Sequence, residues 1–449
     1  MMNIFNTKKT TRSHFQLKAL VAAVAMTSTF SSIAEIIPSE QVIKDITYLA
    51  GDDLKGRASF SPEIEKAADY IAKRFADIGL KPLASNKNGS FLQSFTVQQI
   101  KPQALAVSLN NNDISDENLA IASTMAKLSW QQGGAQTHII GKDDDMRATL
   151  SKLNQSGGQH LVIINTAHAK LFKGYQGYFK RGLTKLSLEH RGAIVMVLSD
   201  EANIEKYSVS ASAEITKQSL TNVVGVLPGV ESPKEVVLYS SHYDHLGTTP
   251  DGKQIYNGAD DDASGTTAVL NLAQYYQEKG NNKRTLMFSA FTAEEIGGFG
   301  SKYFSQQLNP DDVVAMINIE MIGKPSKFGA GTVWMTGMER SNLGALLNEK
   351  LVAQNTKIYQ DPYPEQGLFY RSDNATLARL GVPAHSFSST QLDKDQHYHQ
   401  VSDDLASLDL TSMHKVIESL ATATQSLVDG EVTPTRVDKE KVRAQGKIY

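Results

Sequence analysis

From Asn222 onward, short apolar segments alternate with helical segments, and this alternation constrains the fold more than any other feature of the chain. The first segment, Val236 to Ser241, is a continuous apolar run of the kind that a strand buried on both faces needs. Further strands are expected at 285–292, 313–321 and 331–336, and helices at 264–276, 300–308, 343–353 and 410–428. The order predicts a three-layer α/β/α protein with a mixed, largely parallel sheet.

The residues before this region also fit a layered domain. Apolar residues recur at helical spacing from Pro62 to Ile78, with Pro62 suited to a first turn and Gly79 to a C-terminal stop. Phe91 to Val97 has the pattern of a strand.

Residues 99–220 differ from the rest, because polar stretches separate strand-like runs such as 161–164 and 193–198. A set of long surface loops is the alternative, but structureless loops of this length are uncommon. We therefore expect an inserted small α/β domain. The predicted division is a segment 1–34, a main domain of 35–98 and 221–430, an inserted domain of 99–220, and a loose polar C-terminal tail of 431–449.

The segment 1–34 has the composition of a secretory signal peptide. Four basic residues up to Lys18 precede an apolar run from Ala19 to Met26, and small residues then lead to Ala34. A membrane anchor needs about 20 apolar residues, so this run is too short for one. The sequence predicts cleavage after Ala34 and export to the periplasm or the medium, without stable membrane association.

Composition excludes some kinds of chemistry and partner. The chain has no cysteine, which rules out thiolate nucleophiles and cysteine zinc ligands. The formal net charge is -3, which gives no reason to expect nucleic acid as a partner.

Histidines and carboxylates gather where the expected strands end. Ligands bind at the carboxyl ends of strands in open α/β sheets, so these side chains are expected to meet. Each one alone is ordinary, but carboxylates crowd together stably only around a cation. The residues at these junctions are His242, Asp244, His245, Asp260, Asp261, Asp262, Glu294, Glu295, Glu320, His397, His399, Asp403 and Asp404.

Two histidines and three carboxylates suffice to bind two zinc ions if one carboxylate bridges them. Such a pair of ions activates a water molecule for amide hydrolysis. Adjacent residues of a strand point in opposite directions, so one of Glu294 and Glu295 can bind metal while the other serves as general base.

The segments His242–Gly247, Gly258–Gly265 and Phe291–Glu295 resemble, in this order, the bacterial di-zinc aminopeptidase family. Its relatives include aminopeptidase S, glutamate carboxypeptidase II and glutaminyl cyclase. The resemblance runs from about Ser39 to Val428 and implies the zinc-exopeptidase fold. It also implies a cis peptide bond between Asp261 and Asp262, and an insertion of the protease-associated type, although 99–220 matches that domain poorly.

The resemblance also implies a role for each site residue. Asp261 would bridge the two zinc ions, with Glu294 as general base and Asp244 orienting His242 through its free ring nitrogen. The family spacing of a histidine followed four residues later by an aspartate selects His399 over His397. Tyr370 fits the oxyanion-stabilising tyrosine approximately, and Asn374 stands where members usually have histidine. The metal ligands would be His242, Asp261, Glu295, Glu320 and His399, with Glu320 where members often have aspartate.

The expected function is therefore that of a secreted zinc aminopeptidase acting on peptides. The alternatives are a carboxypeptidase or dipeptidase of the same superfamily, a glutaminyl cyclase, and a binding protein that has lost activity. All five ligands and the base are present, which argues against the last. The sequence contains no Gly-x-Ser-x-Gly and no His-Glu-x-x-His motif, which disfavours serine hydrolases and thermolysin-like proteases.

Overall fold

The computed structural model describes residues 36–449, so the predicted signal peptide lies outside the described residues. Its main sheet runs in the order β17-β16-β18-β15-β11-β14-β10-β2-β3. The strands in this order are β2 (Leu92–Leu109), β3 (Asn112–Asp113), β10 (Tyr207–Leu227), β11 (Ser232–His242), β14 (Arg284–Phe291), β15 (Val313–Ile319), β16 (Val333–Met335), β17 (Ile358–Gln360) and β18 (Ala384–Ser388). Three short strands complete the sheet: β1 (Lys81–Pro82) and β5 (Lys127–Gln131) pair with β10, and β8 (Leu183–Lys185) pairs with β2.

The centre of the sheet is parallel. Strand β11 pairs in parallel with β14 on one side and with β15 on the other, and β15 pairs in parallel with β18. Antiparallel partners flank this centre, with β10 beside β14 and β16 beside β18. The predicted mixed α/β sheet is confirmed.

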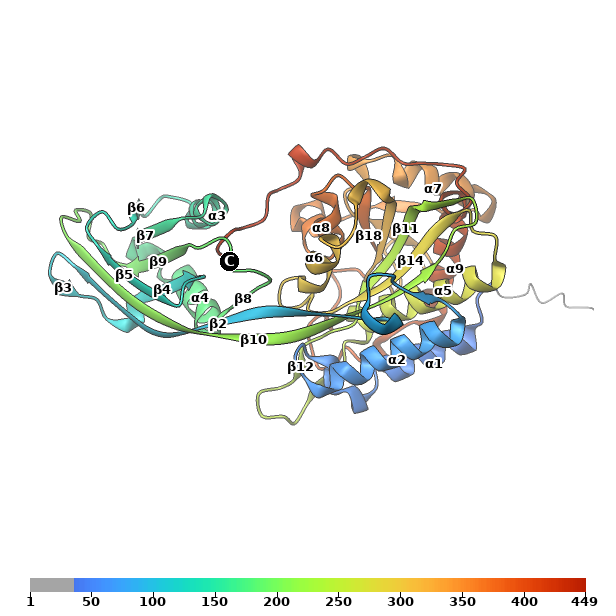
Figure 1. Ribbon diagram of the computed structural model, residues 1–449, viewed down its shortest axis with the longest axis horizontal. Coiled ribbons are helices and arrows are strands. Elements are labelled where there is room, and N and C mark those ends of the chain that lie inside the picture. The colour runs from blue at the N-terminus through green and yellow to red at the C-terminus, as the bar shows by residue number, and fades with distance from the viewer. Residues whose placement is uncertain (1–35) are drawn as a thin grey trace, which may run out of the picture. The chain divides into compact units, whose positions relative to one another are not determined.

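Helices cover both faces of the sheet (Figure 1). In β11, Val237 and Tyr239 pack into one core, and Leu238 between them packs into the core on the other face. Both faces of the strand are buried, which explains its continuous apolar sequence. The helices on the first face are α1 (Ser39–Leu49), α2 (Pro62–Ile78), α5 (Gly265–Lys279), α7 (Leu343–Leu351), α9 (Leu410–Ala423) and α10 (Gln425–Val428), and those on the second are α6 (Phe299–Ser305) and α8 (Asn374–Ala378).

Helix α2 has the predicted bounds, and local chemistry explains both ends. The Ser61 hydroxyl accepts a hydrogen bond from the amide of Ile64, and Pro62 occupies the first turn. Gly79 ends the helix in the left-handed conformation with φ 89°.

The inserted region contains its own sheet and cores. Four strands in the order β4-β9-β7-β6 form the sheet, and the predicted strand runs 161–164 and 193–198 lie in β7 and β9. Two apolar cores lie against it. The other elements of this region are β4 (Leu119–Ser123), β5 (Lys127–Gln131), β6 (Gln136–Ile140), α3 (Met146–Ser156), β7 (Gln159–Ile164), α4 (Ala169–Lys180), β8 (Leu183–Lys185) and β9 (Ala193–Leu198).

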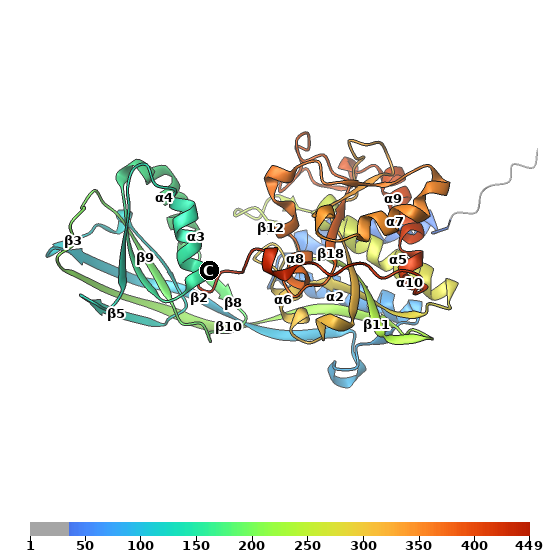
Figure 2. The ribbon, with the colours of Figure 1, turned by 90° about the horizontal axis from the view of Figure 1, so that it is seen from above.

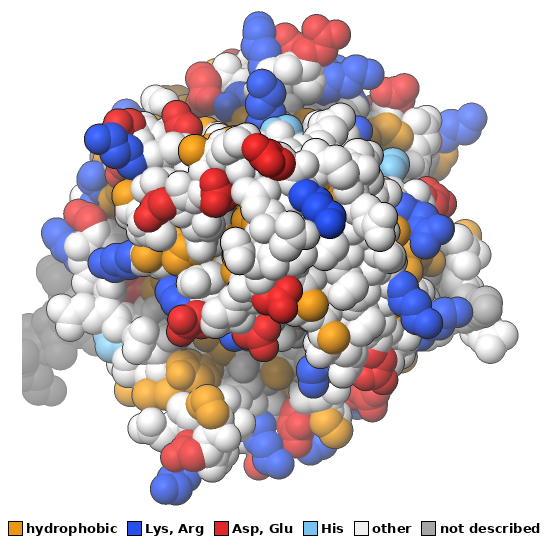
Figure 3. Space-filling view, turned by 90° about the vertical axis from the view of Figure 1, so that its left-hand side faces the viewer, with side chains coloured by type: hydrophobic (Ala, Val, Ile, Leu, Met, Phe, Trp, Pro, Cys, Tyr) orange, Lys and Arg blue, Asp and Glu red, His pale blue; other side chains and the backbone are white. Residues whose placement is uncertain are grey.

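Strands β2 and β10 connect the two sheets. They pair antiparallel from Leu92 with Val223 to Leu109 with Tyr207, and Figures 1 and 2 show them as one long ribbon. Both pass through the predicted boundaries at 98/99 and 220/221, so the division into domains stays a prediction. On the face shown in Figure 3, acidic and basic side chains are intermixed.

The C-terminal segment is packed, so the prediction of a loose tail was wrong. Val437 and Val442 are buried in the core on the second face of the main sheet, and Ile448 is buried in a core of the inserted region. The side chain of Asn154 accepts hydrogen bonds from the amides of Ile448 and Tyr449. A few spaced apolar residues therefore anchor a segment whose composition is mostly polar.

Among residues 36–449, no helix has the length and apolar character required to cross a membrane.

Candidate metal centre

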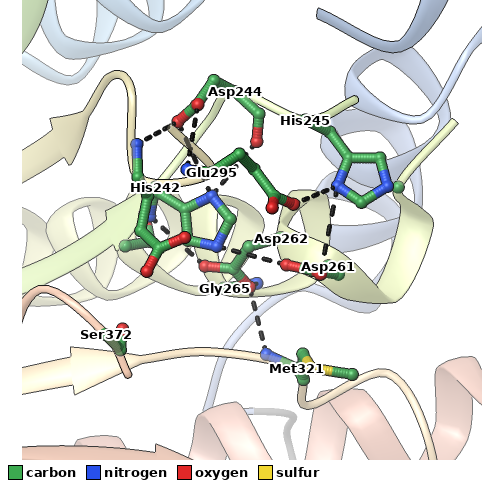
Figure 4. A network of polar contacts seen from close by, with 12 residues as sticks. His242, Asp244, His245, Asp261, Asp262, Gly265, Glu295, Met321 and Ser372 are labelled. Carbon is green, nitrogen blue, oxygen red and sulfur yellow. Dashed lines mark hydrogen bonds and ion pairs between the residues drawn. The ribbon is translucent and has the colours of Figure 1, made fainter. Parts of the chain in front are cut away.

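Four of the predicted site residues, His242, Asp244, Asp261 and Glu295, lie close together at one edge of the parallel strands (Figure 4). His242 is the last residue of β11, Glu294 and Glu295 follow the end of β14, and Glu320 follows β15. Since His242 pairs with Phe291 in the parallel ladder, the ends of β11 and β14 are level with each other. The sheet itself brings these groups together.

Of the three consecutive aspartates, only Asp261 has its carboxylate among the histidines. One oxygen lies 3.2 Å from Nε2 of His242, and the other lies 3.2 Å from Nε2 of His399. The Asp262 carboxylate accepts hydrogen bonds from the amides of Gly265 and Met321, and that of Asp260 accepts from the amide of Gly323. The two outer aspartates are therefore engaged in holding the loop.

The peptide bond between Asp261 and Asp262 is cis, as the family resemblance implies. The backbone amides of Asp260 and Asp261 both donate to the Asp403 carboxylate. Asp403 thus connects the loop before α5 with the segment that carries His399.

Two groups of side chains can each hold a metal ion. The first is His242, Asp261 and Glu320, and the second is His245, Asp261 and Glu295. Asp261 belongs to both groups, which is the arrangement that a bridging carboxylate requires.

A further histidine, His399, lies close to the two carboxylates of the second group. Nε2 of His399 is 3.2 Å from an oxygen of Asp261 and 3.2 Å from an oxygen of Glu295. Nδ1 of His245 is 2.8 Å from Oε1 of Glu295 but 4.0 Å from Asp261. His399 lies midway between both carboxylates, whereas His245 is nearer to one of them, so the distances favour His399.

Sequence reasoning gave His245 no role. Along an extended strand His245 would face away from His242, but β11 ends at His242 and the chain turns there, with a bridge between His245 and Ala58. The only signal was its position in the same strand-end motif.

Asp244 contacts His242 in a different way from the one expected. Its backbone carbonyl, not its carboxylate, lies within hydrogen-bonding distance of Nδ1 of His242, at 3.1 Å, and the carboxylate is 3.7 Å away. The carboxylate accepts hydrogen bonds from the amide of Glu294 at 3.0 Å and from the Ser59 hydroxyl. Asp244 therefore fixes both the histidine and the turn that carries the two glutamates.

Glu294 belongs to neither group of ligands. It lines the cavity next to them, together with Glu295 and His399. Burial raises the pKa of Glu294 well above its ordinary value, and the charges of nearby carboxylates add to the increase. A carboxyl with this surrounding is suited to accept a proton near neutral pH.

Arg57 is buried beneath the site and binds only backbone. Its guanidinium donates to the carbonyls of Leu49, Tyr243, Asn257 and Gly258, which belong to separate segments. Gly56 precedes it with φ 71°, and a Cβ there would lie 2.2 Å from the carbonyl oxygen of Tyr256. Position 56 therefore requires a glycine for Arg57 to reach these carbonyls.

Two tyrosines line the cavity. The Tyr370 hydroxyl accepts a hydrogen bond from the amide of Arg443, and its ring lies under the Arg443 guanidinium. Tyr398, which sequence reasoning did not single out, stacks on the ring of His399 with centroids 4.0 Å apart, and its hydroxyl accepts from Arg371. Burial raises the pKa of Tyr398, and the charge of Asp261 adds to this. Tyr398 thus lies in direct contact with a candidate ligand.

Asn374 and Asp373 lie behind the site and are buried. The Asn374 amide donates to the carbonyl of Phe369, and its oxygen accepts from Ser386, so it has a structural role. Burial raises the pKa of Asp373 to about 6.

The residues present fit zinc. Nε2 of His242, both ring nitrogens of His245 and Oε1 of Glu295 are buried without hydrogen-bonding geometry toward any described residue. Buried polar atoms normally have partners, and these atoms belong to residues of the two candidate groups. Imidazole nitrogen and carboxylate oxygen are both zinc ligands.

The fold is that of zinc aminopeptidases. The chain superposes on an aminopeptidase from Aneurinibacillus sp. strain AM-1 with a TM-score of 0.54 and 18% identity, covering 91% of this chain and 97% of that one. A zinc aminopeptidase from Bacillus subtilis gives a TM-score of 0.51 with 15% identity, covering 92% of this chain and 99% of that one.

Residues 222–424 match the model of peptidase family M28. A probable zinc metalloprotease of Pyrenophora teres f. teres is 30% identical over 192 residues, 42% of this chain and 40% of the relative. Leucine aminopeptidase 1 of Arthroderma gypseum is 24% identical over 311 residues, 67% of this chain and 80% of the relative. The chain thus spans less than half the length of the first curated relatives that it matches.

Proposed function

We propose that this protein is a zinc-dependent aminopeptidase that releases N-terminal amino acids from peptides and binds two zinc ions per chain. The observation that carries the proposal is the position of the Asp261 carboxylate, with one oxygen 3.2 Å from His242 and the other 3.2 Å from His399. The similarity to a leucine aminopeptidase over two thirds of the chain supports an exopeptidase.

In this proposal each ion has its own ligands besides the shared Asp261. His242 and Glu320 would hold one ion. Glu295 and His399, whose Nε2 lies 3.2 Å from a Glu295 oxygen, would hold the other. When bound, zinc supplies Lewis-acid polarisation of the substrate carbonyl and lowers the pKa of water.

Glu294 accepts the proton of the attacking water and then delivers it to the leaving amine. Asp244 keeps Glu294 in place by accepting a hydrogen bond from its backbone amide. A tyrosine hydroxyl donates to the oxygen that develops negative charge. Tyr370 was expected in this role from sequence, and the stacking on His399 favours Tyr398.

A substrate panel tests the proposal against its alternatives. The panel compares the hydrolysis of four kinds of substrate: leucine p-nitroanilide, N-acetylated peptides, peptides with C-terminal amides, and a peptide with an N-terminal glutamine. The metal content is measured on the same sample. An aminopeptidase cleaves the free-amine substrates and spares the acetylated ones. Release of C-terminal residues from acetylated peptides would indicate a carboxypeptidase, and cyclisation of glutamine without hydrolysis would indicate a glutaminyl cyclase.

Dialysis against a chelator should abolish hydrolysis. It should also lower the melting temperature, because zinc that binds the native state stabilises it and the chelator removes that zinc. Added zinc should restore both. Full activity of protein shown to be metal-free would contradict the proposal.

Export is a separate part of the proposal. N-terminal sequencing of protein recovered from the periplasm or medium should start at Glu35, and an intact Met1 on a membrane-bound product would contradict it.

A further inference from the structure

The cavity that contains Glu294 extends far beyond the metal centre. Its volume is about 1580 Å³, whereas small-molecule sites typically measure roughly 300–1,000 Å³. Its wall includes residues of the inserted region, of α6 and α8, and of the C-terminal segment. The space suits a peptide of several residues.

Part of this wall is cationic. We call Lys185, Lys302, Arg379 and Arg443 the cationic wall, and all four line the cavity. Apart from Glu294 and Glu295 at the metal centre, Glu189 is the one acidic side chain among the described residues of the lining, so basic side chains outnumber acidic ones beyond the metal centre. The face in Figure 3 differs from this, since charges of both signs are mixed there.

The four cations lack acidic partners. Among residues 36–449, no carboxylate lies within 4.0 Å of their charged nitrogens, although the chain forms such ion pairs elsewhere. Lys302 donates to the carbonyl of Gly297, and Nε of Arg379 donates to the carbonyl of Arg443. These bonds position the side chains without an ion pair, and the charges of Asp373 and Glu294 act on Lys302 only from a longer distance.

Like charges are close enough to affect one another. Burial and the charges of Lys185 and Arg379 lower the pKa of Lys302 to about 8. Burial also lowers the pKa of Arg379, with Arg443 adding to the effect. An anion bound here would relieve this repulsion.

We propose that the cationic wall binds a carboxylate of the peptide substrate on the C-terminal side of the bond that is cleaved. This rests on the proposed aminopeptidase function. The positively charged α-ammonium group of the substrate is repelled by the cationic wall and attracted by the carboxylates of the metal centre. A short peptide in its zwitterionic form therefore matches the polarity of the cavity, and the enzyme prefers peptides with a carboxylate a few residues after the N-terminus.

Matched peptides test this inference. Leu-Gly-Gly, its C-terminal amide and Leu-Gly-Asp-amide are compared with leucine p-nitroanilide at low and high salt. We expect kcat/KM for Leu-Gly-Gly to exceed that for its amide by about tenfold or more, the scale of a hydrogen bond to a charged group. Salt should reduce this ratio. If kcat/KM for Leu-Gly-Asp-amide also exceeds that for the Leu-Gly-Gly amide, the cationic wall accepts a side-chain carboxylate. If it does not, the cationic wall selects the terminal carboxylate. Both results support the inference.

Substitutions locate the effect. Lys302→Gln and, separately, the exposed Arg443→Gln should lower the acid-to-amide ratio toward one. Lys253→Gln is the control, because Lys253 is a lysine whose side chain is 80% exposed and which does not line the cavity. Equal kcat/KM for the acid and the amide in the unaltered protein, with both cleaved, overturns the inference and leaves the proposed function standing. If no substrate loses its N-terminal residue, the proposed function itself fails.

Discussion

At the scale of single residues, Glu294 and Glu295 are neighbours in sequence with separate expected roles. Glu294→Gln should lower kcat by about 10²–10⁴-fold, the usual contribution of a general base, while two zinc ions stay bound. Glu295→Gln should lose one ion, because Glu295 belongs to the second ligand group and also lies 3.2 Å from His399. Metal analysis and single-turnover rates on both variants check this. The reverse pattern would exchange the two roles.

The second histidine ligand can be decided in the same way. His399→Ala should reduce the zinc content by about one ion per chain, since its Nε2 contacts both Asp261 and Glu295. His245→Ala should retain two ions with weaker affinity, because it contacts the Glu295 carboxylate at 2.8 Å. Zinc titration with a competing chelator measures both, and loss of an ion in His245→Ala alone would make His245 the ligand.

Replacing each of the two tyrosines by phenylalanine tests which hydroxyl stabilises the oxyanion. Tyr398→Phe should lower kcat by about 10²-fold or more if its hydroxyl stabilises the oxyanion, with KM little changed. Tyr370→Phe should have the smaller effect, since the Tyr370 hydroxyl lies against the backbone of Arg443. A larger loss of kcat in Tyr370→Phe would support the assignment made from sequence.

At the scale of secondary-structure elements, Arg57 joins parts of the chain that lie far apart in sequence. Its guanidinium satisfies backbone carbonyls at the end of α1, after β11 and in the loop before α5. Arg57→Met should destabilise the protein by about 3 kcal/mol or more, because several buried acceptors lose their donor. Urea unfolding of the metal-free protein measures this without a contribution from zinc. Arg57→Lys should recover part of the stability, and no change in either variant would contradict the role.

The elements also show what the sequence could predict. Helix α2 and the strands of the main sheet follow from apolar periodicity, and the site follows from where those strands end. Strand β2 continues to Leu109 rather than ending at Val97, because pairing with β10 extends it through residues with a weak pattern of their own. The approach of His245 and the packing of 431–449 depend on tertiary contacts that no local pattern records.

At the scale of the whole described chain, β2 and β10 belong to the main sheet and extend into the inserted region, which has a four-stranded sheet and apolar cores of its own. Segments made early in synthesis therefore pack against segments made much later. Helix α1 is made early, yet its buried Asp45 hydrogen-bonds to Asn271 in α5, and Leu92 pairs with Val223 across the whole inserted region.

Contacts between residues so distant in sequence slow folding. The apolar faces of α1 and α2 therefore remain uncovered on a growing chain until α5 has been made. We expect the nascent peptidase part to depend on protection by a chaperone during that interval, whereas residues 99–220, whose four-stranded sheet forms among themselves, can organise sooner.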